Sequence, residues 1–471
     1  MTSSTNAFAA SPPKAPLYVV ILAAGKGVRM RSALPKVLHP VAGRPMVRHV
    51  LDVAGKLSPA AMVVVIGAGQ DSVAAAVKPA STVVQDPPQG TGHAVMVAAE
   101  ALPKGEGTVL VLFGDSPLIT TETLERLIAA REAGNAVVVL AFRPPSATGY
   151  GRLVTAPDGA LLRIVEEKDA AAEERTIGLC NGGVMALSAV HLPALLAKLD
   201  RSNAQGEYYL TDVVRHARAS GLACIAVEGP AEDVLGVNSR ADLAVAEAVF
   251  QRRLRRAAMA AGVTLNDPDT VYLSADTEFG QDVIVGQNVV FGPGVTVASN
   301  VTIKPFCHLE GASIAEGAII GPFARLRPGA KIGQDAHIGN FVEIKNAAIE
   351  TGAKANHLAY IGDARVGAGA NIGAGTITCN YDGFDKHFTD IGKGAFVGTN
   401  SSLVAPVKIG DGAYIGSGSV VTNDVPADAL ALGRGRQVER EGWAKSFRER
   451  KLEAKKQKPE GGKKSKGASE V

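Results

Sequence analysis

Residues 312–344, ASIAEGAIIGPFARLRPGAKIGQDAHIGNFVEI, decide the fold of the second half of the chain. A large aliphatic residue recurs at every sixth position of this stretch, at Ile314, Ile320, Leu326, Ile332, Ile338 and Ile344. An α-helix repeats every 3.6 residues and a strand every two, so neither explains a period of six held this long. Hexapeptide β-helix repeats do explain it, because each large residue points inward and a small residue after it lets the backbone turn a corner.

The six-residue period continues on both sides of this stretch. It starts earlier, at Val285, Phe291, Val297, Ile303 and Leu309, and it returns later, at Ile391, Val397, Leu403, Ile409 and Ile415. Residues 378–390 break the period, which predicts a loop that projects from the coil. We therefore expect a β-helix domain over residues 263–443.

The first half of the chain alternates short apolar runs with segments that favour helix. The runs are Tyr18–Leu22, Met62–Ile66, Thr108–Phe113 and Ala136–Phe142. Runs of this kind with crossovers between them predict a mostly parallel sheet flanked by helices, over residues 17–238.

A linker helix is expected between the two domains, over residues 239–262. Ser239 is a candidate N-cap. Helical spacing follows it, at Leu243, Ala246, Phe250 and Leu254.

Composition places the chain among globular proteins of more than one domain. It has 471 residues, of which 46% are hydrophobic and 20% charged. No run approaches the roughly 20 apolar residues of a membrane span, so we expect no membrane insertion. The four cysteines form no CxxC pair, which argues against a disulfide framework and a zinc site and favours a reducing cytoplasm.

Both ends of the chain differ in composition from the rest. Residues 1–16 are rich in Ser, Ala and Pro and predict a disordered extension. From Trp443 onward there are ten Lys or Arg against four Asp or Glu, and we expect residues 444–471 to be a basic, disordered tail. Because no aromatic residues or nucleic-acid motif accompany these charges as a pattern, we expect no nucleic-acid partner.

A phosphate site is predicted directly after the first apolar run, in LAAGKGVRM, residues 22–30. Gly25 and Gly27 permit a tight turn that presents backbone N–H groups to an anion, while Arg29 and Lys36 add positive charge. The segment is neither a dinucleotide fingerprint nor a P-loop. Asp115 ends another apolar run, where ligands collect in open α/β sheets, and its carboxylate suits Mg²⁺.

These motifs resemble those of a known family. LAAGKGVRM followed by LPK at residues 34–36 resembles the signature of sugar nucleotidyltransferases. With QGTGH at 89–93, NAQGEYY at 203–209, GVN at 236–238 and the hexapeptide repeats, the chain is similar to the bifunctional N-acetylglucosamine-1-phosphate uridylyltransferase/glucosamine-1-phosphate acetyltransferase family over roughly residues 17–443. The resemblance implies an α/β fold with a Rossmann-like nucleotidyltransferase domain followed by a left-handed parallel β-helix of hexapeptide repeats.

The resemblance also implies two reactions in sequence. The C-terminal domain would N-acetylate glucosamine 1-phosphate with acetyl-CoA. The N-terminal domain would then transfer uridylyl from UTP to N-acetylglucosamine 1-phosphate with Mg²⁺, releasing pyrophosphate. A homotrimer is expected. Two alternatives remain, a single-activity pyrophosphorylase with an oligomerising β-helix and a non-catalytic assembly subunit; the latter is disfavoured by Arg29, Lys36 and Asp115.

By the same resemblance, residues of the first site take distinct roles. Arg29 and Lys36 would be catalytic, and Asp115 and Asn238 would hold the metal. Those expected to bind UTP and its uridine are Leu22, Ala24, Gly25, Lys36, Gln85, Gly90 and Thr91. Those expected to bind the sugar phosphate are Gly149, Glu166, Asn181 and Asn238. Phe113 stands where the family usually has Tyr, which puts any hydrogen bond from that hydroxyl in doubt.

The second site starts from a spacing. Arg327 and Lys345 are 18 residues apart, so on three-sided coils they stack one layer apart on one face. Two cations so close repel unless solvent or a bound phosphate separates their charges, and both readings stay open.

The resemblance assigns the other residues of this second site. His357 would be the general base, with an ordinary pKa near the working pH. Acceptor-binding residues would be Arg327, Lys345, Tyr360 and Asn371. Acetyl-CoA-binding residues would be Ala374, Asn380, Tyr381, Thr399, Ser417 and Arg434. Thr399 replaces the family's common Ser, and Ser417 its common Ala.

Overall fold

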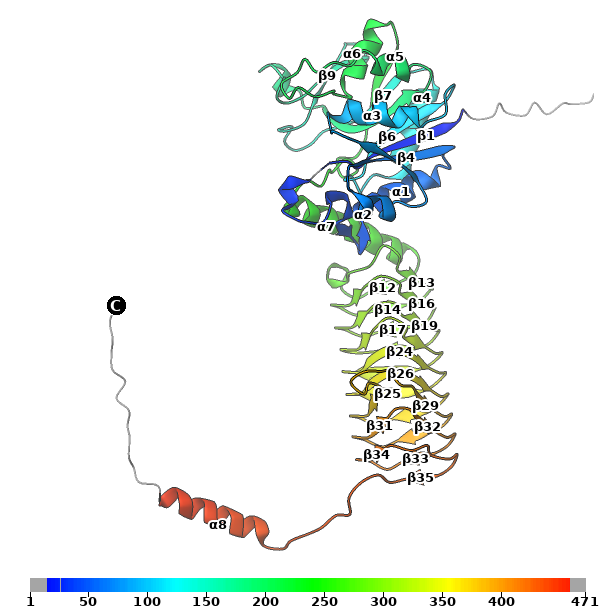
Figure 1. Cartoon of the computed structure of the whole chain (residues 1–471), viewed down its shortest axis with the longest axis vertical. Coiled ribbons are helices and arrows are strands. Elements are labelled where there is room, and N and C mark those ends of the chain that lie inside the picture. Colours follow the sequence, from blue (N-terminus) through cyan, green and yellow to red (C-terminus); the bar gives the residue numbers. More distant parts are fainter. Residues whose placement is uncertain (1–14, 26, 458–471) are drawn as a thin grey trace, which may run out of the picture.

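The computed structural model describes residues 15–25 and 27–457 and contains two bodies joined by a long helix, α7 (Figure 1). The first body is an α/β domain, and the second is a column of stacked short strands. The helices are α1 (Met46–Lys56), α2 (Asp71–Ala76), α3 (Thr91–Glu100), α4 (Thr121–Glu132), α5 (Leu192–Leu196), α6 (Asp212–Ala219), α7 (Arg240–Ala260) and α8 (Trp443–Lys456). Short 3₁₀ turns are η1 (Val28–Met30), η2 (Lys36–Leu38), η3 (Glu174–Thr176) and η4 (Pro268–Thr270).

The first domain is built on one nine-stranded sheet in the order β11-β7-β10-β6-β1-β4-β5, with β8 and β9 attached beside β10. The strands are β1 (Leu17–Leu22), β4 (Ala61–Gly67), β5 (Ser81–Gln85), β6 (Thr108–Phe113), β7 (Val137–Phe142), β8 (Arg152–Thr155), β9 (Leu161–Val165), β10 (Cys180–Ser188) and β11 (Cys224–Glu228). Strands β1, β4, β5 and β6 pair in parallel, as do β7 and β11, whereas β10 is antiparallel to both β6 and β7. The predicted mostly parallel sheet and its four predicted strands are confirmed.

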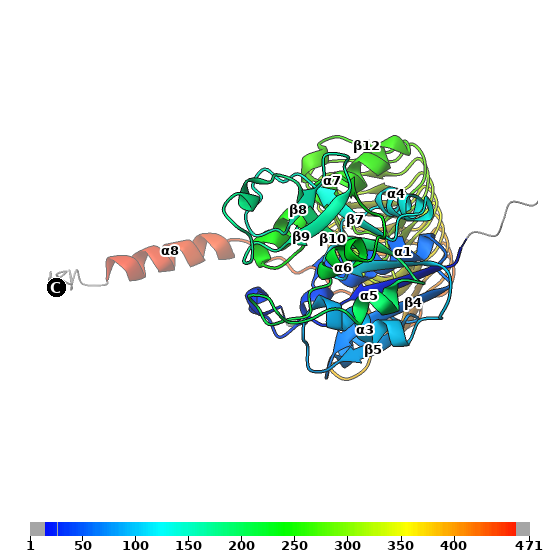
Figure 2. The ribbon, with the colours of Figure 1, turned by 90° about the horizontal axis from the view of Figure 1, so that it is seen from above.

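Helices cover both faces of this sheet because its central strands alternate their side chains between two cores (Figure 2). In β1, Val20 packs with α3, α5 and α6 on one face. Val19 and Ile21 pack with α1 and α4 on the other face. The site edge of the sheet is therefore anchored from both sides.

Helix α7 leaves the first domain and ends at the first coil of the column. Its N-terminus is a capping box in which the Ser239 side chain accepts from the Asp242 N–H and the Asp242 side chain accepts from the Ser239 N–H. This confirms Ser239 as the predicted N-cap. The expected apolar positions divide between two cores, since Leu243, Ala246 and Phe250 contact the first domain and Leu254 packs against the column.

The second domain is a three-sided parallel β-helix. Each strand pairs with the strand 17 or 18 residues later, as Ile284 does with Thr302 and Thr302 with Ile319. One side is β12 (Thr264–Leu265), β14 (Ile284–Val285), β17 (Thr302–Ile303), β20 (Ile319–Ile320), β23 (His337–Asn340), β25 (Lys354–His357), β27 (Asn371–Ile372), β30 (Phe396–Val397), β33 (Tyr414–Ile415) and β35 (Leu430–Ala431).

Two long strands, β24 (Glu343–Ile349) and β26 (Tyr360–Val366), each span a corner between the other two sides. One of these sides also contains β15 (Val290–Phe291), β18 (His308–Leu309), β21 (Arg325–Leu326), β28 (Ile377–Cys379), β31 (Ser402–Val404) and β34 (Val420–Val421). The other also contains β13 (Glu278–Phe279), β16 (Thr296–Val297), β19 (Ser313–Ile314), β22 (Lys331–Ile332), β29 (Thr389–Ile391) and β32 (Val407–Ile409).

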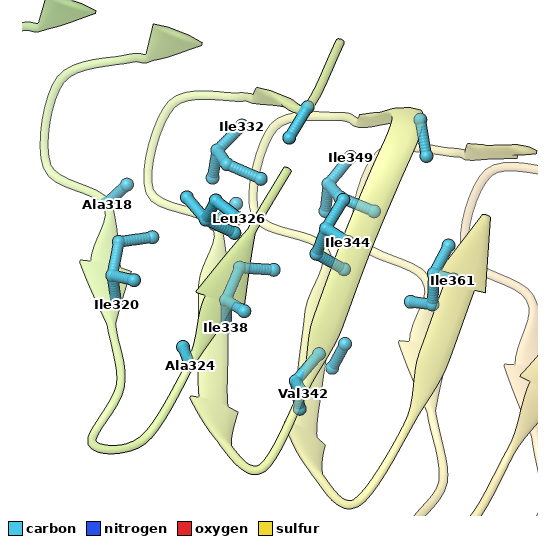
Figure 3. Close-up of a cluster of buried hydrophobic side chains, with 14 of the residues drawn as sticks. Ala318, Ile320, Ala324, Leu326, Ile332, Ile338, Val342, Ile344, Ile349 and Ile361 are labelled. Carbon is cyan, nitrogen blue, oxygen red and sulfur yellow. The ribbon is translucent and has the colours of Figure 1, made fainter. Parts of the chain in front are cut away.

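The large residue of each hexapeptide lies inside the column, as the six-residue period predicted. Ile320, Leu326, Ile338 and Ile344 are fully buried, and Figure 3 shows their side chains turned toward one another between successive coils. The predicted loop is also present, since the chain leaves the coil after Cys379 and rejoins it at Thr389, with a bridge between Tyr381 and Lys386 inside the loop.

The end of the chain corrects one expectation. Residues 444–456 were expected to be disordered, but they belong to α8, an exposed helix that lies apart from the rest of the chain in both views (Figures 1 and 2). Good helix formers explain the difference, because Ala, Lys, Arg, Glu and Leu dominate the segment, and the ring of Trp443 stacks on that of Phe447.

The predicted N-terminal extension and the remainder of the predicted tail fall largely outside the described residues, which exclude 1–14 and 458–471. Pro16, by contrast, is ordered against the sheet, where its carbonyl accepts from the Thr108 N–H at 2.9 Å. No helix within the described residues combines the length and the apolar character needed to cross a membrane.

The column predicts a position-dependent cost for the same substitution. Ile320→Ala, at a fully buried site, should lower the free energy of unfolding by about 2–5 kcal/mol because it leaves a cavity between coils. Ile284→Ala, at a site 42% exposed, should cost less than about 1 kcal/mol. Chemical denaturation followed by circular dichroism checks this, and equal midpoint shifts would contradict the inward assignment.

Candidate functional sites

A cavity of about 320 Å³ lies at the carboxyl ends of β1, β5 and β6. Its walls include every residue predicted to bind UTP, together with Asp115, Phe113 and Glu207. The predicted set on these walls is Leu22, Ala24, Gly25, Lys36, Gln85, Gly90 and Thr91. Residues from four separate segments of sequence thus meet in one place, which is where parallel sheets collect ligands.

One cation lies between the two predicted metal ligands. The Lys36 ammonium contacts the Asp115 carboxylate and donates to the Asn238 side-chain oxygen at 3.1 Å. Both partners come from loops after buried elements, since Asp115 follows β6 and Asn238 precedes α7. The Val237 N–H donates to the Asp115 carbonyl at 2.9 Å, so backbone contact holds the two loops together.

The loop before α3 is closely packed and needs glycine. Gly90 has a φ of 104°, and a Cβ there would lie 2.6 Å from the Tyr208 carbonyl oxygen. The Tyr208 carbonyl instead accepts from the Gly92 N–H at 2.8 Å, and the Gln85 side chain donates to the Gly90 carbonyl at 3.0 Å. The N-terminus of α3 and its N–H groups are thereby fixed at the wall of the cavity.

The predicted sugar residues form a second group beside the cavity. The Asn181 N–H donates to the Gly151 carbonyl at 2.8 Å, and a Cβ at Gly151 would lie 3.2 Å from a Glu166 carboxylate oxygen. Glu166 accepts from the Thr211 hydroxyl at 3.2 Å. Burial raises the pKa of Glu166, although the Thr211 hydrogen bond opposes this shift.

Arg29 and Gly149 lie outside the lining of the cavity. Arg29 is exposed in η1, next to Met30, whose carbonyl accepts from Arg240 of α7 at 3.2 Å. Gly149 occupies a turn with a φ of 85°. Their predicted roles stay predictions.

On the column, Arg327 and Lys345 stack as predicted. The pairing of Arg325 with Glu343 and of Leu326 with Ile344 brings them side by side on adjacent coils. Glu343 partly neutralises this pair, because it accepts from Arg327 at 2.8 Å.

A third cation joins them from the projecting loop. The ammonium of Lys386, and then the guanidinium of Arg327, lower the pKa of Lys345. Nearby, Asp363 accepts from Asn346 at 2.6 Å and from Asn380 at 2.5 Å, which fixes the start of the loop. Three positive groups without matching carboxylates make this surface suited to an anion.

The Tyr360 hydroxyl reaches the same coil row as Lys345. Lys345 pairs in register with Gly362, and a Cβ at Gly362 would collide with the Tyr360 hydroxyl. Because Gly362 has no side chain, the hydroxyl can lie over it.

His357 lies in an exposed column of residues along one corner. It pairs in register with Asn340, whose side-chain oxygen lies 2.7 Å from His357 Nδ1. The register of the following strands continues the column through Ala374, Thr399 and Ser417.

Arg434 completes this column, because its guanidinium donates to the Ser417 carbonyl at 2.8 Å. Four of the predicted acetyl-CoA residues therefore lie in line with His357, one coil apart. Adjacent coils are roughly 4.8 Å apart, so the line suits an extended ligand.

Asn371 and Tyr381 are not brought into this column. Asn371 pairs with Lys354 and Phe396, toward the start of the side that His357 ends. Tyr381 is exposed in the projecting loop, with its hydroxyl donating to the Gly383 carbonyl at 2.6 Å.

Sequence reasoning missed three residues at these sites, Glu207, Thr211 and Asn340. Glu207 lines the nucleotide cavity, Thr211 holds Glu166 and Asn340 holds His357. Only Asn340 carried a signal, since its distance of 17 residues from His357 is one coil with a five-residue step.

Comparisons with known proteins match both halves of the chain. Residues 19–181 match the MobA-like NTP transferase domain, and residues 311–346 and 388–423 match the bacterial transferase hexapeptide (six repeats). The hexapeptide match identifies the column as a left-handed β-helix of this repeat class, which completes the predicted fold class.

Three relatives match over nearly the whole chain, each named bifunctional protein GlmU. The relative from Parvibaculum lavamentivorans is 64% identical over 442 residues, which are 93% of this chain and 97% of that protein. The relative from Rhodospirillum rubrum is 63% identical over 431 residues, 91% and 96% of the two chains. The relative from Paramagnetospirillum magneticum is 58% identical over 434 residues, 92% and 96%.

The burial of Glu166 predicts a pH-dependent stability. A carboxyl with a raised pKa stabilises the fold at low pH and loses that contribution as pH rises through the raised value. Glu166→Gln removes the ionisation and keeps an acceptor for Thr211. The melting temperature of this variant, relative to the unsubstituted chain, should therefore increase between about pH 4 and pH 8.

The neighbouring Glu167 gives the control, because it is paired with Arg152 at 2.7 Å. Glu167→Gln should gain no stability over the same pH range. A flat difference for Glu166→Gln would contradict the buried, unpaired carboxyl.

Proposed function

Because the chain belongs to the family of the bifunctional protein GlmU, we propose that its two sites carry out two successive reactions. The chain is a nucleotidyltransferase and an acyltransferase of UDP-N-acetylglucosamine synthesis. The β-helix site N-acetylates glucosamine 1-phosphate, and the cavity of the first domain joins the product to UTP. The observation that carries this proposal is the convergence of the predicted residues into one cavity and one column on the two domains.

At the first site, a sugar-phosphate oxygen attacks the α-phosphorus of UTP. The bond from that phosphorus to the oxygen bridging to the β-phosphate breaks, and pyrophosphate leaves. Lys36 and the backbone N–H groups at the start of α3 neutralise phosphate charge, while Gln85, Gly90 and Thr91 hold the uridine. Arg29 is assigned to the outer phosphates, since it lies on the exposed turn that follows Gly25.

The residues at this site also fit Mg²⁺. Asp115 and Asn238 present two hard oxygen donors that already reach one common cation, the Lys36 ammonium. When bound, Mg²⁺ would neutralise charge on the phosphates and orient them. No cluster of three or more His, Cys, Asp or Glu side chains exists in the described part of the chain, so the phosphates themselves would complete the coordination.

The sugar side of the first site is assigned to Gly149, Glu166, Asn181 and Asn238. Glu166 is a buried hydrogen-bond acceptor held by Thr211, which suits recognition of a sugar hydroxyl or amide. A site with buried polar groups rejects substrates that leave those groups unpaired.

At the second site, His357 is the general base. Its Nδ1 donates to the Asn340 side-chain oxygen at 2.7 Å, which leaves Nε2 free to accept a proton. The amine nitrogen of glucosamine 1-phosphate attacks the thioester carbonyl carbon of acetyl-CoA. Nε2 takes the amine proton, and the carbon–sulfur bond breaks to release CoA thiolate.

The cation cluster holds the acceptor of this reaction. Arg327, Lys345 and Lys386 converge on one surface, and the phosphate of glucosamine 1-phosphate relieves their mutual repulsion. Tyr360 lies over the same row, and Asn371 completes the acceptor set. Ala374, Thr399, Ser417 and Arg434 line the path of acetyl-CoA, with Asn380 and Tyr381 at the loop.

Further copies of the chain are assigned to an apolar ridge beside His357. Phe306, Phe323, Phe341 and Leu358 occupy the same corner of four consecutive coils, and each is between 45% and 60% exposed. Neighbouring rings stack, with centroids 4.9 and 5.1 Å apart. All four have φ between 51° and 62°, a region that bulky side chains avoid.

A strained and exposed apolar ridge of this kind is typical of a protein–protein interface. We assign it to a homotrimer, in which the neighbouring copy completes the second site beside His357. All four cysteines are free thiols, which supports the proposed cytoplasmic location.

The two-site assignment predicts separable activities. His357→Ala should reduce CoA release by a factor of about 100 or more and leave pyrophosphate release unchanged, because it removes only the base of the second site. Asp115→Ala should have the opposite effect. Both releases are measured on the same preparation, and unchanged CoA release in His357→Ala would reject the proposed base and favour a single-activity enzyme.

The ridge predicts that assembly depends on its aromatic side chains. Phe341→Asp should reduce the mass measured by light scattering from three times 48.4 kDa to 48.4 kDa and abolish CoA release. The fold should persist, because Asp adopts a positive φ more easily than Phe does. The control is Tyr272→Asp, which places the same charge at an exposed aromatic site outside the ridge; a trimeric Phe341→Asp variant would contradict the assignment.

A further inference from the structure

The hairpin that follows Lys36 is held at its tip by the linker helix and by the first coil of the column. Strands β2 (Pro40–Val41) and β3 (Arg44–Pro45) form this hairpin. At its tip, the Ala42 N–H donates to Glu247 Oε2 of α7 at 2.7 Å. The Ala42 carbonyl accepts from the Ala275 N–H at 2.8 Å and from the Ser274 hydroxyl at 3.1 Å.

Gln251, one turn after Glu247 on α7, ties the helix to the same coil. This side chain is only 2% exposed. Its Nε2 donates to Glu247 Oε1 at 2.8 Å and to the Leu273 carbonyl at 2.7 Å, and its Oε1 accepts from the Leu273 N–H at 2.9 Å. The first coil, Gln251, Glu247 and the hairpin therefore form one continuous set of hydrogen bonds.

The start of α7 holds the partner of Lys36. The N–H groups of Asn238 and Ser239 donate to the Asp242 carboxylate at 3.0 and 2.8 Å. The Asn238 side-chain oxygen in turn accepts from Lys36. One helix thus fixes Asn238 directly and Lys36 through the hairpin.

A small core joins the segments that carry the first site. Met30, Val41, Leu118 and Val237 pack together with α7 residues Ala246 and Val249. Three of these residues lie within three positions of Arg29, Asp115 or Asn238, and Val41 lies in the hairpin after Lys36. Movement of α7 would therefore displace several groups of the site at once.

We propose that Glu247 and Gln251 are positioning residues for uridylyl transfer, and that the first coil of the β-helix is part of the support of that site. The carboxylate of Glu247 makes no ion pair in the part of the chain that the structure describes. Its charge strengthens the hydrogen bond from the Ala42 N–H, which holds the chain segment that carries Lys36. The inference rests on the proposed role of Lys36.

The test measures both activities in four variants of the full chain. Glu247→Ala should lower kcat/KM for pyrophosphate release about 10- to 100-fold, since small misplacements of a charged group cost this much. It should also raise the Mg²⁺ concentration for half-maximal rate, because Lys36 shares Asp115 and Asn238 with the metal. Glu247→Gln keeps one oxygen for the Ala42 N–H and should recover activity to within about threefold of the unsubstituted chain.

Arg255→Ala is the matched control. Arg255 lies on the same helix and donates to Asp269 and the Val271 carbonyl of the first coil, but not to the hairpin, so both activities should persist. CoA release serves as an internal measure of folding in every variant. A Glu247→Ala variant that matches the unsubstituted chain, or that loses both activities equally, would overturn the inference.

Lys36→Ala separates this inference from the proposed function. If Lys36→Ala retains full pyrophosphate release, the role of Lys36 is wrong and the inference fails with it. If Lys36→Ala is inactive while Glu247→Ala is fully active, only the positioning role is overturned.

Discussion

The stacking of coils 17 or 18 residues apart is the constraint on which the second half of the molecule depends. Backbone hydrogen bonds between coils fix which residues become neighbours, whatever their side chains. Inward positions take aliphatic residues, and outward positions are free for chemistry. This is why Arg327 lies beside Lys345, Asn340 beside His357, and Ala374, Thr399 and Ser417 in line with His357. A site built on such a ladder is rigid because it shares the core of the fold.

The first site depends on a different device, a charge held between loops. Lys36, Asp115 and Asn238 come from three segments, and each segment packs on α7 or on a strand end. The ammonium of Lys36 compensates the carboxylate until phosphates and a metal arrive. Because α7 also contacts the first coil through Gln251, the two domains are joined by buried hydrogen bonds as well as by the chain itself.

Periodic features could be predicted from the sequence, and contacts between distant segments could not. The six-residue period identified the inward residues, the stacking of Arg327 on Lys345 and the projecting loop, because each follows from counting along the chain. The tip of the hairpin at Ala42 and its grip by Glu247 depend on how the domains pack, which leaves no local pattern. Thr211 and Glu207 were missed for the same reason. The α8 helix was missed because a high density of like charges suggested disorder, although the residues favour helix.

The central claim is that one chain carries two chemically independent sites, only one of which needs a metal. A chelator titration of one preparation, with all substrates present, tests it most directly by following CoA release and pyrophosphate release in the same sample. The account predicts that pyrophosphate release stops, that it returns when Mg²⁺ is added, and that CoA release continues throughout. Loss of both releases, or of neither, would contradict the account.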